Sequence, residues 1–430
     1  MTSFISLRKS IFTILYIVIG SVFAMAADPM ATTYTDAQCQ GSLTPYPLKV
    51  AETATPDSLV AIHVNHVGRH GSRYPASAAS CNTLLHALQH SDSLGLLTAT
   101  GRELLSLTQR AIAASQGRWG ALDSLGMAEQ RSIASRMMQR YPDLFKDGAK
   151  VRALSSYSPR SMMSMFCFIH QMARMNNRIE VISSSGRQNS PLMRPFDVND
   201  DYKQFRDDRL WEPTYNAYFE QYCPVSAITR ALGRDYPFGG TDEARELAIT
   251  EYYVIAGMAA MEIECDASHF FTPAEYNALW SCFNLRQYLQ RTATTVSSVP
   301  ADIAGTLLMD IIRTTDLATD SRNNDGVAAD LRFGHAETLM PLLSLLRLPG
   351  CYYMTNYFDT VALNWKDFEV VPMAANLQIV LFKAKRSGRY YVRFDVNEKT
   401  VKLPGDHMGL YVPWNIARDY MMRCVPLYAQ

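Results

Sequence analysis

Two arginines flank a histidine in one short segment, Arg69-His70-Gly71-Ser72-Arg73-Tyr74-Pro75. Guanidinium groups hold phosphate oxygens through paired hydrogen bonds and keep their charge at any working pH. A neutral imidazole between them can attack phosphorus while the arginines stabilise charge on the remaining oxygens. The residue types and their spacing therefore indicate transfer of a phosphoryl group. We expect His70 to be the nucleophile and Arg69 and Arg73 to bind the phosphate.

A second polar segment lies far downstream, at Arg332-Phe333-Gly334-His335-Ala336-Glu337-Thr338. It follows an expected strand at 328–333 and opens an expected helix. The first segment also follows an expected strand, at 58–67, which is apolar and rich in β-branched residues. Ligands of open α/β sheets bind at the carboxyl ends of strands, so both segments are predicted to meet at one edge of a sheet.

The first segment fits the pattern RHGxRxP, which fixes five positions and arises by chance on the order of once in ten thousand chains of this length. This pattern is the signature of the histidine acid phosphatases, the second branch of the histidine phosphatase superfamily, and the chain resembles them here. The resemblance implies a two-step, metal-free hydrolysis through a phosphohistidine at His70, with no cofactor.

Most histidine acid phosphatases carry His-Asp in the second segment, whereas this chain has His335-Ala336-Glu337. That variant resembles the multiple inositol-polyphosphate phosphatases, a subgroup with phytase activity. The resemblance implies that Glu337 donates a proton to the departing alkoxide and later activates water. It also implies that His335 and Ala336 belong to the phosphate pocket, and that the substrate is a phosphorylated inositol.

Two further arginines match the family. The stretch 151–166 resembles the segment in which a strand and a loop lead to an arginine that opens a helix, which places Arg160 in the phosphate pocket. Arg152 is the competing candidate, but it lies within the expected strand. The segment 192–197 resembles part of the inositol-polyphosphate subgroup, so Arg194 is a candidate substrate contact, with an ordinary solvated arginine as the alternative.

The elements that must position these residues alternate between strands and helices up to about residue 200. Strands are expected at 150–154 and 179–182, and helices at 98–114, 124–141 and 159–172. From 202 to 317 the apolar spacing is helical, with helix starts expected at Asp242, Thr272 and Pro300. Strand-like sequence returns at 328–333, 377–384 and 390–396.

This order predicts an α/β fold with a helix-flanked, mostly parallel sheet that is discontinuous in sequence and carries a mainly α-helical inserted domain. The expected division is a first part of the phosphatase core at 27–200, the insertion at 201–325 and a second part of the core at 326–430.

The first 26 residues resemble an export signal. Arg8 and Lys9 precede an apolar run at 11–23, and Ala24-Met25-Ala26 is a small-x-small cleavage pattern. We therefore expect a cleaved signal peptide and a periplasmic or secreted protein; a retained membrane anchor is the alternative. The eight cysteines suit an exported protein with a few disulfides, among which a Cys265–Cys282 pairing is one possibility.

The amino-acid composition limits the classes of partner that the protein is expected to bind. The formal net charge is zero, which gives no global attraction to nucleic acid or to an anionic membrane. The absence of a CxxC pair argues against a structural zinc site. His63, His66 and His70 could suggest a metal, but in a strand His63 and His66 point to opposite faces. We expect a monomer that binds a small phosphorylated molecule and no metal.

Two other functions remain open from the sequence. One is a broad-specificity acid phosphatase that acts on sugar or nucleotide monophosphates. The other is a non-catalytic protein that uses the same pocket to capture phosphorylated ligands. His70 and Glu337 argue against the second, because binding alone needs neither a nucleophile nor an acid.

Overall fold

The computed structural model describes residues 34–51, 53–320, 322, 326–405 and 409–429. The expected signal peptide at 1–26 lies outside these residues. None of the helices in the described ranges is long and apolar enough to cross a membrane. The strands and helices are β1 (Leu59–Arg69), β2 (Lys150–Ser155), β3 (Glu180–Ser185), β4 (Val327–Gly334), β5 (Asn376–Ala384), β6 (Tyr390–Val396), β7 (Lys399–Val401), β8 (Val412–Pro413), α2 (Asp36–Cys39), α3 (Ala79–Ser93), α4 (Ala99–Ser115), α5 (Ser124–Arg140), α6 (Pro159–Met175), α7 (Ser190–Met193), α8 (Pro195–Val198), α9 (Asp200–Asp207), α10 (Glu212–Tyr222), α11 (Ser226–Leu232), α12 (Thr241–Ala256), α13 (Pro273–Arg291), α14 (Val299–Asp302), α15 (Gly305–Thr319), α16 (Ala336–Leu345), α17 (Val361–Asn364), α18 (Asp367–Val370) and α19 (Trp414–Cys424).

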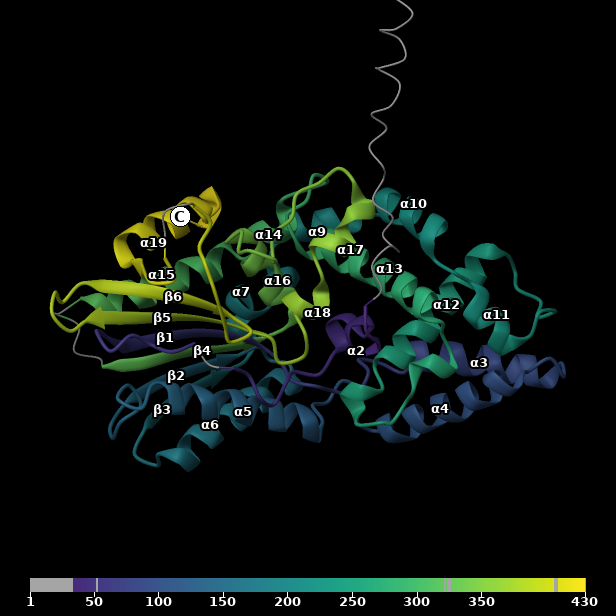
Figure 1. The fold of residues 1–430 in the computed structure, drawn as a ribbon, viewed down its shortest axis with the longest axis horizontal. Helices are drawn as coiled ribbons and strands as arrows, with labels where there is room; N and C mark the ends of the chain where they lie inside the picture. Colours follow the sequence, from purple (N-terminus) through teal and green to yellow (C-terminus); the bar gives the residue numbers. More distant parts are fainter. Residues whose placement is uncertain (1–33, 52, 321, 323–325, 406–408, 430) are drawn as a thin grey trace, which may run out of the picture.

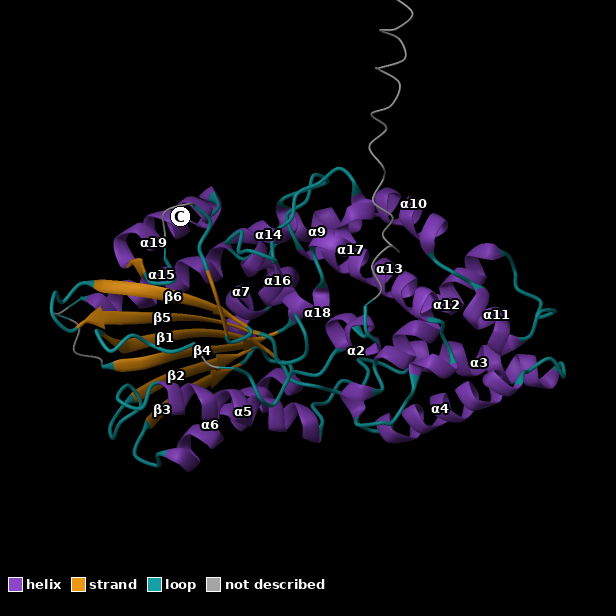
Figure 2. Ribbon diagram, viewed as in Figure 1, coloured by secondary structure: helices purple, strands orange, loops and turns teal. Residues whose placement is uncertain are grey.

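The strands form one sheet in the order β3-β2-β4-β1-β5-β6-β7, with β8 paired to β6 (Figure 2). The pairs β3–β2, β2–β4 and β4–β1 are parallel. β5 runs antiparallel to β1, and β6 reverses the direction again, so five of the eight strands point the same way. The predicted mostly parallel sheet is confirmed, with an antiparallel extension on the β5 side.

Helices cover both faces of this sheet. On one face, α5 and α6 bury apolar side chains such as Met137 and Phe168 against Val64 and Phe333 of the strands. On the other face lie α15 and α19, and Leu308 of α15 belongs to the same core as Ile379 of β5 (Figure 1). Because the sheet is covered on both sides, β1 from His63 onward and β4 from Ala328 onward are buried on both faces. Some polar side chains among them are paired inside the core; Arg332, for example, donates to Asn65.

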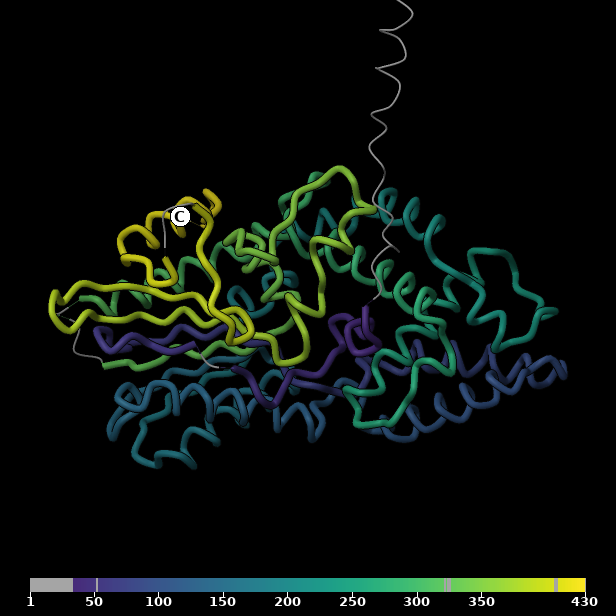
Figure 3. Tube along the Cα trace, in the orientation of Figure 1, coloured from purple at the N-terminus to yellow at the C-terminus, as the bar shows by residue number. Residues whose placement is uncertain are grey.

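A largely helical part lies beyond one end of the sheet. Between β3 and β4 the described residues contain helices and no strand, as predicted. Figure 3 shows that α3 and α4, from early in the chain, run beside α11 and α12. Ser91 of α3 donates a hydrogen bond to the carbonyl of Leu232, and Thr98 donates to that of Arg230. The domain bounds 27–200, 201–325 and 326–430 stay a prediction, and α3 and α4 show that the helical part also uses residues from before 201.

The helix starts follow local capping chemistry. Thr272 is the N-cap of α13 and forms a reciprocal capping box with Glu275, as its position predicted. Asp242 lies in the first turn of α12. Pro300 lies at the start of α14, as expected, but this helix is a single turn, and the long helix α15 begins at Gly305.

The sequence suggestion of a Cys265–Cys282 disulfide is wrong in this structure. All eight cysteines are free thiols, and the side chain of Cys282 forms a hydrogen bond with Cys223 instead. Cys282 is buried within α13, where it faces the end of α10.

Candidate active site

The two polar segments lie side by side because β1 and β4 are parallel neighbours. Arg69, the last residue of β1, pairs with Gly334, the last residue of β4. The next residues are therefore adjacent as well: the amide of His70 donates to the carbonyl of Gly334 over 3.1 Å. The imidazole rings of His70 and His335 lie with their centroids 5.7 Å apart. The predicted meeting of both segments at the carboxyl edge of the sheet is what the structure shows.

His70 is held in a form suited to nucleophilic attack. Its Nδ1 lies 2.9 Å from the carbonyl oxygen of Gly71, which can only accept, so Nδ1 carries the proton and Nε2 keeps its lone pair. The ring is buried. Burial, followed by the charges of Arg160, Arg69 and Arg73, holds the pKa of His70 well below its usual value. A neutral imidazole with a free Nε2 is the nucleophilic form.

The loop after His70 is fixed by α5, which sequence reasoning did not connect to the site. The carboxylate of Glu129 accepts from the amide and the hydroxyl of Ser72, each over 2.7 Å. It also accepts from the amide of Tyr46. Burial raises the pKa of Glu129 to about 7 against the effect of these donors. Glu129 lies on the buried face of α5, with Gly126 and Ile133. An acidic residue at an apolar position of that helix was the one feature of the sequence that could have indicated its role.

Three guanidiniums surround His70, and their charges oppose one another. Arg69 donates from Nη1 to the carbonyls of Ser42 and Val371, each over 2.6 Å, while its buried Nε has no hydrogen-bond partner. Burial and then Arg73 lower the pKa of Arg69 to about 10, and the same two causes lower that of Arg160 to about 10. A cluster of like charges with an unused buried donor is a strong candidate site for an anion.

His335 joins the same cluster as the N-cap of α16. Its Nε2 lies 2.9 Å from Nη1 of Arg194 and 3.0 Å from the hydroxyl of Ser156, and its Nδ1 lies 3.4 Å from Nη2 of Arg160. Burial lowers the pKa of His335 to about 3; the charge of Glu337 opposes this, and those of Arg160 and Arg194 add to it. His335 is therefore neutral and is no source of a proton for catalysis.

Arg194 lies in the site rather than in solvent. It follows α7, donates from Nε to Asp197 over 2.5 Å, and stacks on the rings of Tyr157 and Phe196 at 4.9 and 4.7 Å. These contacts aim the guanidinium at His335. Any substitution of Arg194 will therefore disturb His335.

Glu337 lies in the first turn of α16, where the helix dipole favours a negative charge. Its Oε1 accepts from Nη2 of Arg291, the last residue of α13, over 3.0 Å. Burial acts to raise the pKa of Glu337, but the charges of Arg291 and Arg69 hold it well below the usual range. Ala336 is buried beside it and adds no charge. Sequence reasoning missed Arg291, because a basic residue at a helix end is ordinary.

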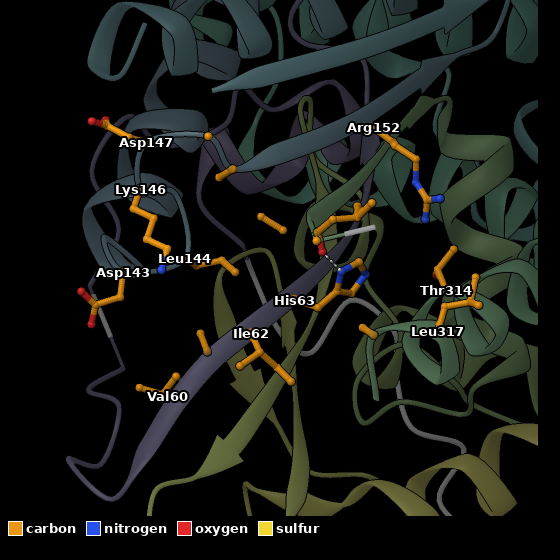
Figure 4. A pocket seen from close by; sticks show the side chains of 17 residues that line it. Val60, Ile62, His63, Asp143, Leu144, Lys146, Asp147, Arg152, Thr314 and Leu317 are labelled. Atoms are coloured by element: carbon orange, nitrogen blue, oxygen red, sulfur yellow. Dashed lines mark hydrogen bonds between the residues drawn. The ribbon is translucent and has the colours of Figure 1, made fainter. Parts of the chain in front are cut away.

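The histidines of β1 do not converge. Nδ1 of His63 lies 3.0 Å from the carbonyl of Val327, at a cavity of about 460 Å³ by the amino ends of the strands (Figure 4). His66 packs between the rings of Phe168 and Phe333. Nowhere in the described ranges do three or more His, Cys, Asp or Glu side chains form a group that could hold a metal ion.

Comparison with known proteins places the chain. Residues 62–397 match the family model of the histidine phosphatase superfamily, branch 2. The human multiple inositol polyphosphate phosphatase 1 is 24% identical over 386 residues, which cover 82% of this chain and 76% of the human protein.

Solved structures share the fold. The multiple inositol polyphosphate phosphatase of Bifidobacterium longum, in complex with inositol hexasulfate, has a TM-score of 0.74 at 17% identity and covers 88% of this chain and 96% of its own. The phytase from D. castellii has a TM-score of 0.70 at 16% identity, with 95% and 90% covered. The match over most of the chain shows that this protein belongs to branch 2 of the histidine phosphatase superfamily and is a phosphatase.

Proposed function

We propose that the protein hydrolyses the phosphate esters of inositol polyphosphates, phytate among them, through a phosphohistidine at His70. The observation that carries the proposal is one constellation: neutral His70 and the carboxyl of Glu337 flank a cluster of arginines at the carboxyl edge of the sheet. The relatives named above, which act on inositol polyphosphates by their names, support this substrate class.

The proposed first step transfers the phosphoryl group to the enzyme. Nε2 of His70 attacks phosphorus, a P–N bond forms and the ester P–O bond breaks. Arg69, Arg73 and Arg160 stabilise the equatorial oxygens, and neutral His335 lies beside them and accepts from the guanidinium of Arg194. The carboxyl of Glu337 gives its proton to the departing alkoxide.

The second step releases inorganic phosphate. The carboxylate of Glu337 removes a proton from a water molecule as that water attacks the phosphohistidine. The P–N bond breaks, and His70 returns to its neutral form. Arg194 and Ala336 would line the part of the site that receives the rest of the substrate.

We infer that the enzyme works as a monomer outside the cytoplasm, after cleavage near Ala26.

The role of Glu337 supplies the test. An inositol alkoxide is a poor leaving group and needs a proton, whereas p-nitrophenolate leaves without one. Glu337→Gln keeps the shape and removes the acid, so phytate hydrolysis should fall by about a hundred- to ten-thousand-fold. Formation of the phosphoenzyme from p-nitrophenyl phosphate should stay within a small factor of wild type. Initial rates with phytate and single-turnover bursts with the aryl ester measure the two effects.

Glu220→Gln is the matched control, because Glu220 is an exposed residue of α10 and belongs to neither of the two motifs. Equal losses on both substrates in Glu337→Gln would contradict the role of Glu337 as the acid for the leaving group. A higher kcat/KM for glucose 6-phosphate than for phytate in the wild type would favour the broad-specificity alternative, and no phosphate release from any ester would favour a binding protein.

A further inference from the structure

One ion pair links the helical part of the molecule to the catalytic edge of the sheet. Arg291 ends α13, and its Nη2 contacts Oε1 of Glu337 in the first turn of α16 over 3.0 Å. Within the described part of the chain, Nη1 of Arg291 donates only to its neighbour Gln290, over 3.2 Å, and its buried Nε has no hydrogen-bond partner. The side chains of Arg291 and Glu337 are 18% and 34% exposed, so both can be reached by a ligand. The guanidinium of Arg291 thus has N–H groups that are available to donate to a ligand.

Three arginines from three different elements act on the charge of Glu337. Arg291 comes from α13, Arg69 from β1 and Arg160 from α6. His335 lies beside it at the start of α16, and Tyr202 of α9 lies near both Arg291 and Glu337. Before a substrate binds, the three arginines keep Glu337 a carboxylate, which has no proton to give to a leaving alkoxide.

We propose that Arg291 is a positioning residue that senses a second phosphate group of the substrate and, by leaving Glu337 for that group, allows Glu337 to act as an acid. The inference rests on the proposed function and names the feature of the substrate that the site requires. A monoester without a second phosphate would leave the Arg291–Glu337 pair intact.

The exchange is favoured by charge and geometry. A phosphate monoester carries about −1.5 to −2 charge at pH 7 and three acceptor oxygens, so it competes well with a carboxylate for a guanidinium fork. When Arg291 turns to that phosphate, Glu337 loses its nearest cation and gains an anion nearby. Both changes favour the protonated carboxyl. The proton enters from water, passes to the leaving oxygen as the P–O bond breaks, and leaves Glu337 a carboxylate ready to activate water.

The test compares two esters that both have poor leaving groups: phytate, with several phosphates, and glycerol 2-phosphate, with one. The rate constant of phosphoenzyme formation is measured at saturating substrate across pH, because this step alone uses the acid. A step that needs protonated Glu337 is lost as pH rises through the pKa of that group in the complex. In the wild type the loss should therefore occur at higher pH with phytate than with glycerol 2-phosphate.

Substitution of Arg291 should remove the difference. Arg291→Met keeps the length of the side chain and removes the cation. With glycerol 2-phosphate, the alkaline limb of the profile, where the rate constant of phosphoenzyme formation falls, should move to higher pH by about one unit. At a pH above the wild-type limb, the rate constant of the variant should be about tenfold higher than that of the wild type. Arg291→Lys keeps the charge and should retain a limb near that of the wild type. Arg286→Met is the matched control, since Arg286 is an exposed residue of the same helix that stacks on Trp211.

Coinciding limbs for the two esters in the wild type would overturn the proposal, as would an Arg291→Met variant with unchanged limbs. The wild-type comparison carries the test even if Arg291→Met does not fold. Failure of sensing is distinguishable from failure of the proposed function, because p-nitrophenyl phosphate needs no acid. If p-nitrophenyl phosphate gives a normal burst but the limbs for phytate and glycerol 2-phosphate coincide, only the sensing role of Arg291 is contradicted. If no ester gives a phosphoenzyme, the proposed function is contradicted.

Discussion

At the scale of single residues, the site combines groups that destabilise one another until an anion arrives. Arg69 and Arg160 each have a pKa lowered to about 10 by burial and by Arg73, and the same charges keep His70 neutral. A bound phosphate relieves the repulsion among the cations, while neutral His70 is already competent to attack. In the proposed mechanism the arginines therefore serve two purposes: they bind the ester and they suppress protonation of His70.

This coupling predicts how the acidic limb of the pH profile responds to Arg160. The pKa of His70 is depressed by burial first and by Arg160 second. Activity that needs neutral His70 is lost as pH falls through that pKa, so the limb should lie well below pH 6.5 in the wild type. Arg160→Met removes the second cause. It should raise the pKa of His70, move the limb to higher pH and lower kcat/KM by about a hundred- to a thousand-fold.

Profiles of kcat/KM with p-nitrophenyl phosphate measure this shift. Arg174→Met is the control, because Arg174 is exposed in the last turn of the same helix. Ionisation of the substrate affects the profiles of both variants equally, so it drops out of the comparison. A limb at the same pH in the Arg160→Met and Arg174→Met variants would show that Arg160 does not act on His70.

At the scale of elements, the loop after β1 is shaped by the first turn of α5. A Cβ on Gly126 would lie 2.1 Å from the carbonyl oxygen of Ser72, and a Cβ on Gly71 would lie 2.5 Å from that of Gly126. Two backbones therefore meet without side chains between them. Glu129, one turn further along α5, holds the amide and hydroxyl of Ser72. The helix fixes the segment between His70 and Arg73 from outside the motif.

We therefore predict that a single methyl group at Gly126 disturbs catalysis. Gly126→Ala should lower the free energy of unfolding by about 1–3 kcal/mol through overpacking. Because the displaced loop carries both the nucleophile and Arg73, turnover should fall by a similar factor with phytate and with p-nitrophenyl phosphate. Denaturant unfolding and initial rates on both esters measure the effects.

Gly409→Ala is the matched substitution, because no heavy atom of the described residues lies within 4 Å of a Cβ at Gly409. Wild-type turnover in Gly126→Ala would contradict the importance of this backbone contact, as would a loss confined to one of the two esters.

Elements with strong local signals were predictable from the sequence, and elements without them were not. The β-branched residues of β1 and the capping residue Thr272 identify their elements directly. Helix α3 was missed: its residues 79–93 include Ser, Asn, Asp and His, which are poor helix formers, and its N-cap Ala78 makes no side-chain hydrogen bond. Packing of Leu84 and Leu88 into the core stabilises it instead.

At the scale of the whole molecule, the site exists because distant parts of the chain are neighbours. β1 lies between β4 and β5, which come from the other end of the sequence. The family motifs predicted the residues on β1, α6 and α16, since each motif is local. They did not predict the Arg291–Glu337 pair, which depends on how α13 meets α16, or the support of Ser72 by Glu129. Tertiary placement of that kind leaves no periodic or compositional trace.

The central claim is that His70 carries the phosphoryl group, and rapid quench tests it most directly. Wild-type protein is mixed with p-nitrophenyl phosphate in EDTA, quenched in alkali, and the phosphorylated residue is located by mass spectrometry; His70→Ala is treated identically. The account predicts a stoichiometric adduct on His70 that survives alkali and is lost in acid, as a phosphoramidate should be, and no adduct or turnover in His70→Ala. An adduct on another residue, the absence of any adduct that survives alkali, or substantial turnover by His70→Ala would contradict it.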